Sequence, residues 1–161
     1  MSMLGEELEG ARVLDLFAGI GGLGMEALSR GAHDCTLVES DAGVARRLRG
    51  AFGVDARVVC GDACDPARLG LTGCYSVVFL DPPWGQGLGV VALEALSAAG
   101  VASEDAVAVV ITEAGSPAEA SGWEVRRRRR HGDGEVTLWS KRERQEGAPR
   151  GSGNERKRLG G

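Results

Sequence analysis

The chain has 161 residues, of which 43% are hydrophobic and 26% charged; this composition indicates one globular domain and excludes a disordered or fibrous protein. Its 26 glycines follow no Gly-X-Y repeat, so a collagen-like chain is excluded as well. The net charge of -4 is unevenly distributed, because residues 1–122 carry 7 basic and 17 acidic side chains and residues 123–161 carry 12 and 6. The split predicts an acidic body with a basic end, which is either a solvated segment or a place for an anionic partner.

The cysteines and the first residues indicate the cellular setting. No pair of the four cysteines has CxxC spacing, so we expect free, mostly buried thiols in a reducing compartment and no metal. The opening residues, MSMLGEELEG, are acidic and lack the apolar stretch of a signal peptide, and no run of about 18 apolar residues exists to cross a membrane. We expect a monomeric cytoplasmic protein.

Short apolar runs typical of strands alternate with helical patterns through most of the chain. The predicted strands span 12–17, 35–39, 56–60, 75–80 and 106–111; one predicted helix ends at residue 29, and the others span 42–52 and 90–99. Near-continuous apolar strands are typical of a parallel sheet with helices on both faces. The repeated strand–helix units predict an α/β protein with a Rossmann-like, doubly wound sheet.

The alternation of strand and helix patterns stops in the last part of the chain. Two extended runs, 123–130 and 135–140, flank a Gly-Asp-Gly turn and predict a C-terminal antiparallel β-hairpin, which brings the sheet to seven strands. Five consecutive arginines, 126–130, lie in the first run, and because alternate side chains of a strand face opposite sides, they cannot all line one groove. We expect one domain over residues 1–140 and a disordered, basic, glycine-rich tail over 141–161.

A glycine-rich turn follows the first predicted strand. Gly19, Gly21 and Gly24 form a GxGxxG pattern between a strand and a helix. Glycine lets the backbone approach a ligand, and the start of the helix offers free amides. Dinucleotide-binding and S-adenosylmethionine-binding folds both contain such a loop, and a tight turn without a ligand is the third interpretation.

Acidic residues near the ends of three strands narrow the choice. The Asp15 carboxylate would repel the pyrophosphate of a dinucleotide but attract the ammonium and sulfonium groups of S-adenosylmethionine. Glu39, about 20 residues after the loop, is placed to accept hydrogen bonds from ribose hydroxyls of either cofactor. Asp62, between Gly61 and Ala63, is placed to accept one from an adenine amino group, or is an ordinary turn aspartate.

The sequence Asp81-Pro82-Pro83-Trp84 follows the fourth predicted strand. Two prolines restrict the backbone, so the Asp81 carboxylate and the Pro82 carbonyl can face a ligand with little freedom. These two oxygens can accept both hydrogens of an exocyclic amino group on a base, and Trp84 offers a flat face on which an extruded base can stack. The alternative is a rigid loop with a buried tryptophan.

Together these motifs resemble a known family. The segment LDLFAGIGGLG (14–24), the acid that ends the second strand and the DPPW loop are similar to class I S-adenosylmethionine-dependent methyltransferases that act on base amino nitrogens. More narrowly, residues 13–19, 23–32 and the text RHGDGEVTLW (130–139) resemble the RsmD-type small-subunit rRNA guanine-N2 methyltransferases. The resemblance covers residues 11–140.

The resemblance implies a Rossmann-like class I methyltransferase fold, S-adenosyl-L-methionine as the cofactor, and ribosomal RNA or the small ribosomal subunit as the partner. It also implies two sets of site residues. They are Asp15, Ala18, Gly19, Gly21, Glu39, Asp62 and Ala63 for cofactor binding, and Asp81, Pro82, Pro83 and Trp84 for catalysis at the target nitrogen.

The chain also departs from the family pattern. An acidic segment of about ten residues stands where the family has an N-terminal extension with a basic segment and a helix. The family's asparagine after the second helix is absent from residues 48–53, and Trp84 stands in place of the more usual Tyr or Phe. The first departure leaves RNA recognition without its usual element, and the arginine run is the candidate to supply it.

Other functions stay open on the residues alone. The DPPW loop suits adenine-N6 of DNA or RNA as well as guanine-N2. The short N-terminus is compatible with a non-catalytic module that only binds the cofactor. An NAD-dependent oxidoreductase is disfavoured by Asp15 and by the lack of an identifiable hydride-transfer residue.

Overall fold

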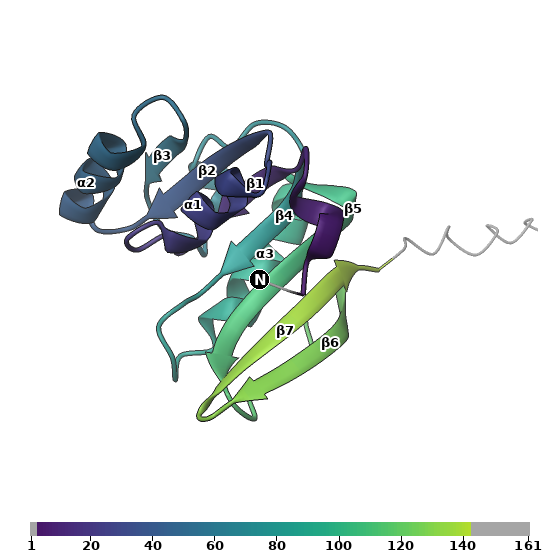
Figure 1. Cartoon of the computed structure of the whole chain (residues 1–161). Coiled ribbons are helices and arrows are strands. Elements are labelled where there is room, and N and C mark those ends of the chain that lie inside the picture. Colours follow the sequence, from purple (N-terminus) through teal and green to yellow (C-terminus); the bar gives the residue numbers. More distant parts are fainter. Residues whose placement is uncertain (1–2, 143–161) are drawn as a thin grey trace, which may run out of the picture.

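The structure, a computed structural model, describes residues 3–142. These residues form seven strands, three α-helices and two short 3-10 helices (Figure 1). In chain order they are η1 (Gly5–Leu8), β1 (Arg12–Asp15), α1 (Gly22–Ser29), β2 (Asp34–Glu39), α2 (Ala42–Phe52), β3 (Arg57–Cys60), η2 (Pro66–Arg68), β4 (Tyr75–Leu80), α3 (Leu88–Ala99), β5 (Ala102–Glu113), β6 (Trp123–His131) and β7 (Gly134–Lys141). The predicted tail lies outside the described residues except for its first two, which continue from the hairpin.

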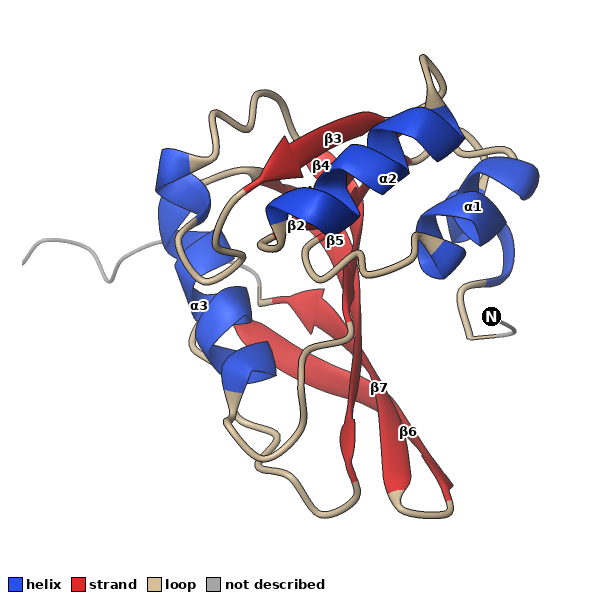
Figure 2. Cartoon of the chain, turned by 90° about the vertical axis from the view of Figure 1, so that its left-hand side faces the viewer, coloured by secondary structure: helices blue, strands red, loops and turns tan. Residues whose placement is uncertain are grey.

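All seven strands join one sheet in the order β3-β2-β1-β4-β5-β7-β6. Strands β1 to β5 pair in parallel, whereas β7 is antiparallel to both β5 and β6. Helices α1 and α2 lie over one face, and α3 lies over the other (Figure 2). The prediction of a Rossmann-like, mostly parallel seven-stranded sheet with a C-terminal antiparallel hairpin is confirmed.

The central strand β4 shows why the sequence folds this way. Val77 and Phe79 pack into the core beneath α1 and α2, and Val78 and Leu80 pack into the core beneath α3. All four are almost inaccessible to solvent, which explains a continuous apolar run rather than an alternating one. Each such side chain contributes about 1.5–3 kcal/mol when fully buried.

Two tryptophans attach the hairpin to the rest of the sheet. Trp123 is fully buried, and its indole nitrogen donates a hydrogen bond to the Leu93 carbonyl of α3 at 3.1 Å. The Trp139 indole nitrogen donates to Thr137 Oγ1 at 2.7 Å, and this hydroxyl donates to the Val110 carbonyl of β5. The hairpin is therefore held in place by burial and by satisfied polar groups on its α3 side.

Several elements differ from the expected boundaries; β1, for example, ends at Asp15 rather than at residue 17. β5 is longer than the predicted 106–111, because its pairing with β7 continues from Val107 to Glu113. The acidic N-terminal segment is also part of the core, which its charge does not suggest. Leu4 and Leu8, at η1, are buried in the core on the side of α1 and α2. No helix within residues 3–142 is long and apolar enough to span a membrane.

The expectation of mostly buried cysteines is wrong. All four thiols are free, but only Cys35 is buried, Cys64 is half-buried, and Cys60 and Cys74 are exposed. Cys60 ends β3, which lies at an edge of the sheet, and Cys74 lies in the loop before β4. Neither of these two positions is covered by a further layer.

Candidate functional site

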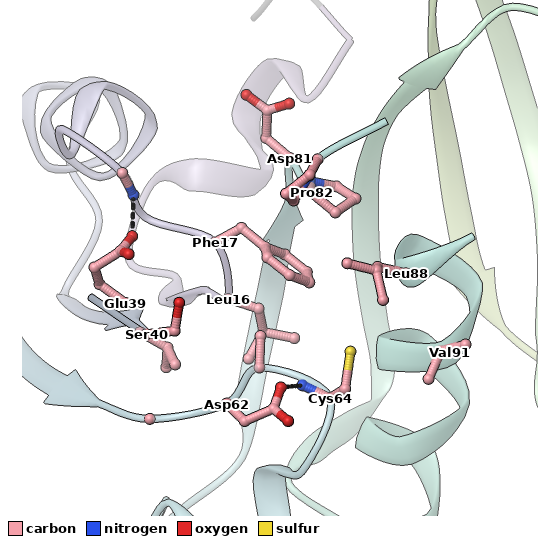
Figure 3. A pocket seen from close by; sticks show the side chains of 15 residues that line it. Leu16, Phe17, Glu39, Ser40, Asp62, Cys64, Asp81, Pro82, Leu88 and Val91 are labelled. Carbon is pink, nitrogen blue, oxygen red and sulfur yellow. Dashed lines mark hydrogen bonds between the residues drawn. The ribbon is translucent and has the colours of Figure 1, made fainter. Parts of the chain in front are cut away.

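A cavity of about 570 Å³ opens at the carboxyl ends of the parallel strands (Figure 3). The loops that follow β1, β2, β3 and β4 form most of its wall, and the first turns of α3 complete it. Parallel strands direct their carboxyl ends to one edge, so side chains from distant parts of the sequence meet there. The volume lies within the range of cofactor and small-ligand sites.

Three acidic residues at the ends of three different strands line this cavity: Glu39 is the last residue of β2, and Asp62 and Asp81 follow β3 and β4 (Figure 3). Glu39 is held from two sides, because its Oε2 accepts a hydrogen bond from the Gly19 amide at 2.9 Å and its Oε1 accepts one from the Asp41 amide at 3.0 Å. The first bond joins the glycine-rich loop to the end of β2. Two fixed carboxylate oxygens at the rim can accept hydrogen bonds from a diol such as a ribose.

Asp62 forms the bond of a turn aspartate and also lines the cavity. Its Oδ1 accepts a hydrogen bond from the Cys64 amide at 2.8 Å, which is the short-range bond of a turn aspartate. The same residue lines the cavity together with the buried Ala63. The turn therefore holds the carboxylate in place at the cavity wall.

The three loop residues Ala18, Gly19 and Gly21 occupy different surroundings. Gly19 lines the cavity, has a φ of +54°, and has no atom within 4 Å of the place that a Cβ would occupy. Gly21 has a φ of +86°, and a Cβ there would lie 2.6 Å from the Phe52 ring of α2. Ala18 is buried and its amide bonds to the Val38 carbonyl. Among these three, only Gly19 reaches the cavity, and Gly21 is required for the close approach of the loop to α2.

Asp15 lies behind the cavity lining rather than in it. Its side chain is 1% exposed, and neither carboxylate oxygen has a hydrogen-bond partner among the described residues. Burial is the largest cause that raises the pKa of Asp15 to about 7, and the negative charges of Asp81 and Glu39 contribute to this rise. The nearby backbone amide of Phe17 acts in the opposite direction without a well-formed bond. A buried carboxylate in this state is costly, and a cation close to it would relieve the cost.

The DPPW loop lies between two cavities. Asp81, Pro82 and Pro83 line the larger cavity, and burial raises the pKa of Asp81. Trp84 instead lines an adjacent cavity of about 430 Å³, together with Glu113 and again Pro82 and Pro83. The alternative of a buried tryptophan is wrong, because Trp84 is 47% exposed.

The Trp84 ring packs against the C-terminal hairpin. A Cβ at Gly134, the first residue of β7, would lie 3.3 Å from two carbons of the indole ring. This close approach brings the loop after β4 against the turn between β6 and β7. The sequence alone gives no sign that these two segments meet.

An apolar wall of the larger cavity was missing from the predicted site. Phe17 lies in its middle, between Leu16 and Pro82, and faces Leu88 of α3 (Figure 3). Val91, one turn further along α3, lines the same wall and is 49% exposed. The spacing of Leu88 and Val91 would have indicated one helix face, but not that this face borders a cavity. Such a wall can cover the flat, apolar part of a ligand.

The described residues contain no group of three or more His, Cys, Asp or Glu side chains arranged to hold a metal ion. The expectation about metal therefore stays a prediction.

Known proteins resemble this chain in sequence and in structure. The Escherichia coli (strain K12) protein "Ribosomal RNA small subunit methyltransferase D" is 36% identical over 124 residues, which cover 73% of this chain and 62% of that protein. The chain thus spans about three fifths of the length of this curated relative. The structure of "Putative methyltransferase yhhF" from Escherichia coli has a TM-score of 0.78 and 31% identity, and covers 87% of this chain and 80% of its own.

A second solved structure agrees with the first. The "putative methylase HI0767" from Haemophilus influenzae has a TM-score of 0.78 and 29% identity, and covers 88% of this chain and 93% of its own. The family model described as "Conserved hypothetical protein 95" matches residues 1–140. This chain therefore belongs to that family, the family of the RsmD-type methyltransferases that its motifs resemble.

Proposed function

We propose that this chain transfers a methyl group from S-adenosylmethionine to the N2 amino group of a guanine in small-subunit ribosomal RNA. The observation that carries the proposal is the wall shared by the two cavities, formed by Pro82, Pro83 and Leu88. A methyl donor in the larger cavity and a base in the smaller one would meet at this wall. The name of the Escherichia coli relative supports ribosomal RNA as the substrate, which would place the reaction in the cytoplasm.

The larger cavity fits S-adenosylmethionine on the chemistry of its walls. Behind the lining, Asp15 has no hydrogen-bond partner within residues 3–142 and gains from a positive charge nearby. In the lining, Glu39 presents fixed acceptors for ribose hydroxyls, and Phe17 and Val91 cover apolar surface. These features match the sulfonium and ammonium, the ribose and the adenine of the cofactor. When bound, the cofactor supplies an electrophilic methyl group. Asp62 is the residue we assign to the adenine amino group.

The protein's part in the reaction is to hold the target nitrogen. The Asp81 carboxylate and the Pro82 carbonyl accept the two hydrogens of the amino group, which leaves the nitrogen lone pair directed at the larger cavity. Because burial raises the pKa of Asp81, this carboxylate accepts a hydrogen bond or a proton more readily than an exposed aspartate does. Pro83 keeps the loop rigid, and Trp84 supplies the stacking surface for the base.

The test combines transfer with product identification. Tritiated methyl transfer is measured to small ribosomal subunits and to naked ribosomal RNA from a strain that lacks the activity, and the digested RNA is analysed for N2-methylguanosine and N6-methyladenosine. Asp81→Ala should lower transfer by about 100-fold or more while cofactor affinity changes less than about twofold. Asp65→Ala is the matched control, because Asp65 lies outside the cavity in an exposed pair with Arg68.

The product decides between the remaining alternatives. N6-methyladenosine as the only product would replace guanine-N2 by adenine-N6. Tight cofactor binding without transfer to either RNA substrate would favour a non-catalytic module. Full transfer by Asp81→Ala would contradict the role assigned to this loop.

A further inference from the structure

The arginines of β6 are sorted by an irregularity in the strand. Val125 pairs with Trp139, and both belong to the core on the α3 side. The register then shifts between Val125 and Arg127, so Arg126 is an extra residue without a cross-strand partner. Strict alternation would have placed Arg127 and Arg129 on the α3 side with Val125. A β-bulge moves every following side chain to the opposite face.

After the bulge, two faces of β6 carry different groups. Arg127, Arg129 and His131 pair with Leu138, Val136 and Gly134, which lie on the face turned away from α3. We call these three residues the basic strip. Arg128 and Arg130 lie on the other face, where Arg128 forms an ion pair with Glu135 at 3.5 Å and the Arg130 side chain bonds to the Gly132 carbonyl. With the bulge, the three side chains of the basic strip lie one after another on the same face of β6.

The basic strip leads to the candidate site. His131 pairs with Gly134, and the Trp84 ring rests on Gly134. Alternate residues of a strand are about 6.7 Å apart, so Arg127, Arg129 and His131 form a row of regular steps that ends beside Trp84. A polyanion lying along this row would have its end at the cavity in which the target base is proposed to sit.

A hollow of about 300 Å³ adjoins the basic strip on the same face. Its floor is apolar, formed by Leu23, Ile111 and Val136 among others, and Arg129 and His131 stand at its side. An apolar floor beside a guanidinium and an imidazole fits an unstacked nucleotide, whose base covers apolar surface while its phosphate accepts hydrogen bonds from these two groups. A duplex keeps its bases stacked inside and has no group for such a hollow.

We propose that the basic strip binds the backbone of an unpaired RNA segment next to the target nucleotide, with one flanking base in the adjoining hollow. This inference rests on the proposed function for the identity of the polymer. Charge complementarity and the continuity of the strip with the Trp84 cavity carry it. The β-bulge at Arg126 decides which side chains lie on this face: Arg127, Arg129 and His131 replace the set that strict alternation would have placed there, which is Arg126, Arg128 and Arg130.

The test compares two double variants of the full chain that remove the same charge from the same strand. Arg127→Gln/Arg129→Gln changes the basic strip, and Arg128→Gln/Arg130→Gln changes the opposite face. Glutamine keeps part of the aliphatic stem, so the apolar residues beneath stay covered. Binding of a labelled 12-nucleotide single-stranded RNA and of a duplex of equal length is measured over a range of salt concentrations, with melting temperature and cofactor affinity as checks on the fold.

We expect the strip variant to bind the single strand about tenfold more weakly, with the slope of log affinity against log salt reduced by about 1.4, and the opposite-face variant to bind within about twofold of the unchanged protein. Equal losses in both variants would overturn the proposal, because only overall charge would then matter. Tighter binding of the duplex than of the single strand would overturn it as well. RNA binding is measured without methyl transfer, so failure of the strip and failure of the proposed reaction give different results.

Discussion

The two ends of the sheet differ in the helices that cover them and in the charged groups that they carry. At one end β3, β2, β1 and β4 lie with helices over both faces, and acidic residues stand where these strands finish. At the other end β5, β7 and β6 carry α3 on one face (Figure 2), and five arginines occupy residues 126–130 of β6. A small ligand can be enclosed by the loops and helices at the edge of a sheet, whereas a polymer needs a strand that is exposed along its length. Cofactor binding and RNA binding should therefore be separable by mutation.

The largest effect on the cofactor end is expected from Gly21→Ala. A Cβ at this position would enter the space of the Phe52 ring, and the φ of +86° disfavours any side chain. We expect the free energy of unfolding to fall by about 2–3 kcal/mol, measured by denaturant titration. Gly19→Ala is the control, since it has a positive φ but no neighbour within 4 Å. Equal losses in the two variants would show that backbone conformation alone matters.

At the junction of the two ends, Trp84→Ala should raise the KM for RNA by about tenfold or more, because stacking on an aromatic ring contributes about 1–3 kcal/mol per base. Cofactor affinity should not change, since Trp84 lines the other cavity. Steady-state kinetics with each substrate varied in turn measure both, and Trp84→Phe should keep most of the RNA affinity. Weaker cofactor binding in Trp84→Ala would contradict the prediction that the two cavities bind their ligands independently.

The pH dependence of cofactor binding should isolate Asp15. The pKa of Asp15 in the folded protein, about 7, lies above its ordinary value of 3.8, so the free chain loses stability as pH rises through this interval. A cationic ligand prefers the ionised carboxylate. Affinity for S-adenosylmethionine should therefore rise between pH 6 and pH 8 by several-fold, and by at most about tenfold. Calorimetric titration should show this rise in the unchanged protein and a flat profile in Asp15→Asn.

The smallest effect is expected from Arg126→Ala. Its guanidinium bonds to Glu124 at 3.0 Å and to Ser140 at 2.6 Å, and the pair with Glu124 is exposed on the strand. Such a pair contributes about 0.2–1 kcal/mol to stability. RNA affinity should change less than about twofold, as measured by the same labelled single strand. A loss equal to that of an Arg127 variant would mean that the bulge does not sort the arginines.

The strand–helix rhythm and the DPPW loop could be predicted because each depends on local pattern. β4 is apolar at every position but one and has helices on both sides, and the loop after it carries its own rigidity in Pro82 and Pro83. The hairpin could be predicted for the same reason, since Gly132 lies in its turn and Gly134 follows directly as the first residue of β7.

Other parts of the site depend on tertiary contacts that leave no local signal. The position of Gly21 follows from Phe52, some thirty residues away in α2. In the sequence, the helix face that contains Val91 looks like any other apolar face. It becomes a cavity wall only because the loops after β1 and β4 lie near it in the fold. The bulge at Arg126 occurs in a run of identical residues, so the sequence there contains no feature that marks the shift of register.

The arginines of β6 also have a consequence for self-association. β6 is the last strand of the sheet, and an uncovered strand edge is a template for pairing with another chain. A row of like charges along that edge repels the same row on a second copy. The arginines proposed to bind RNA are thus the same side chains that oppose pairing of this edge with a second copy, so a variant with fewer arginines should lose part of both effects.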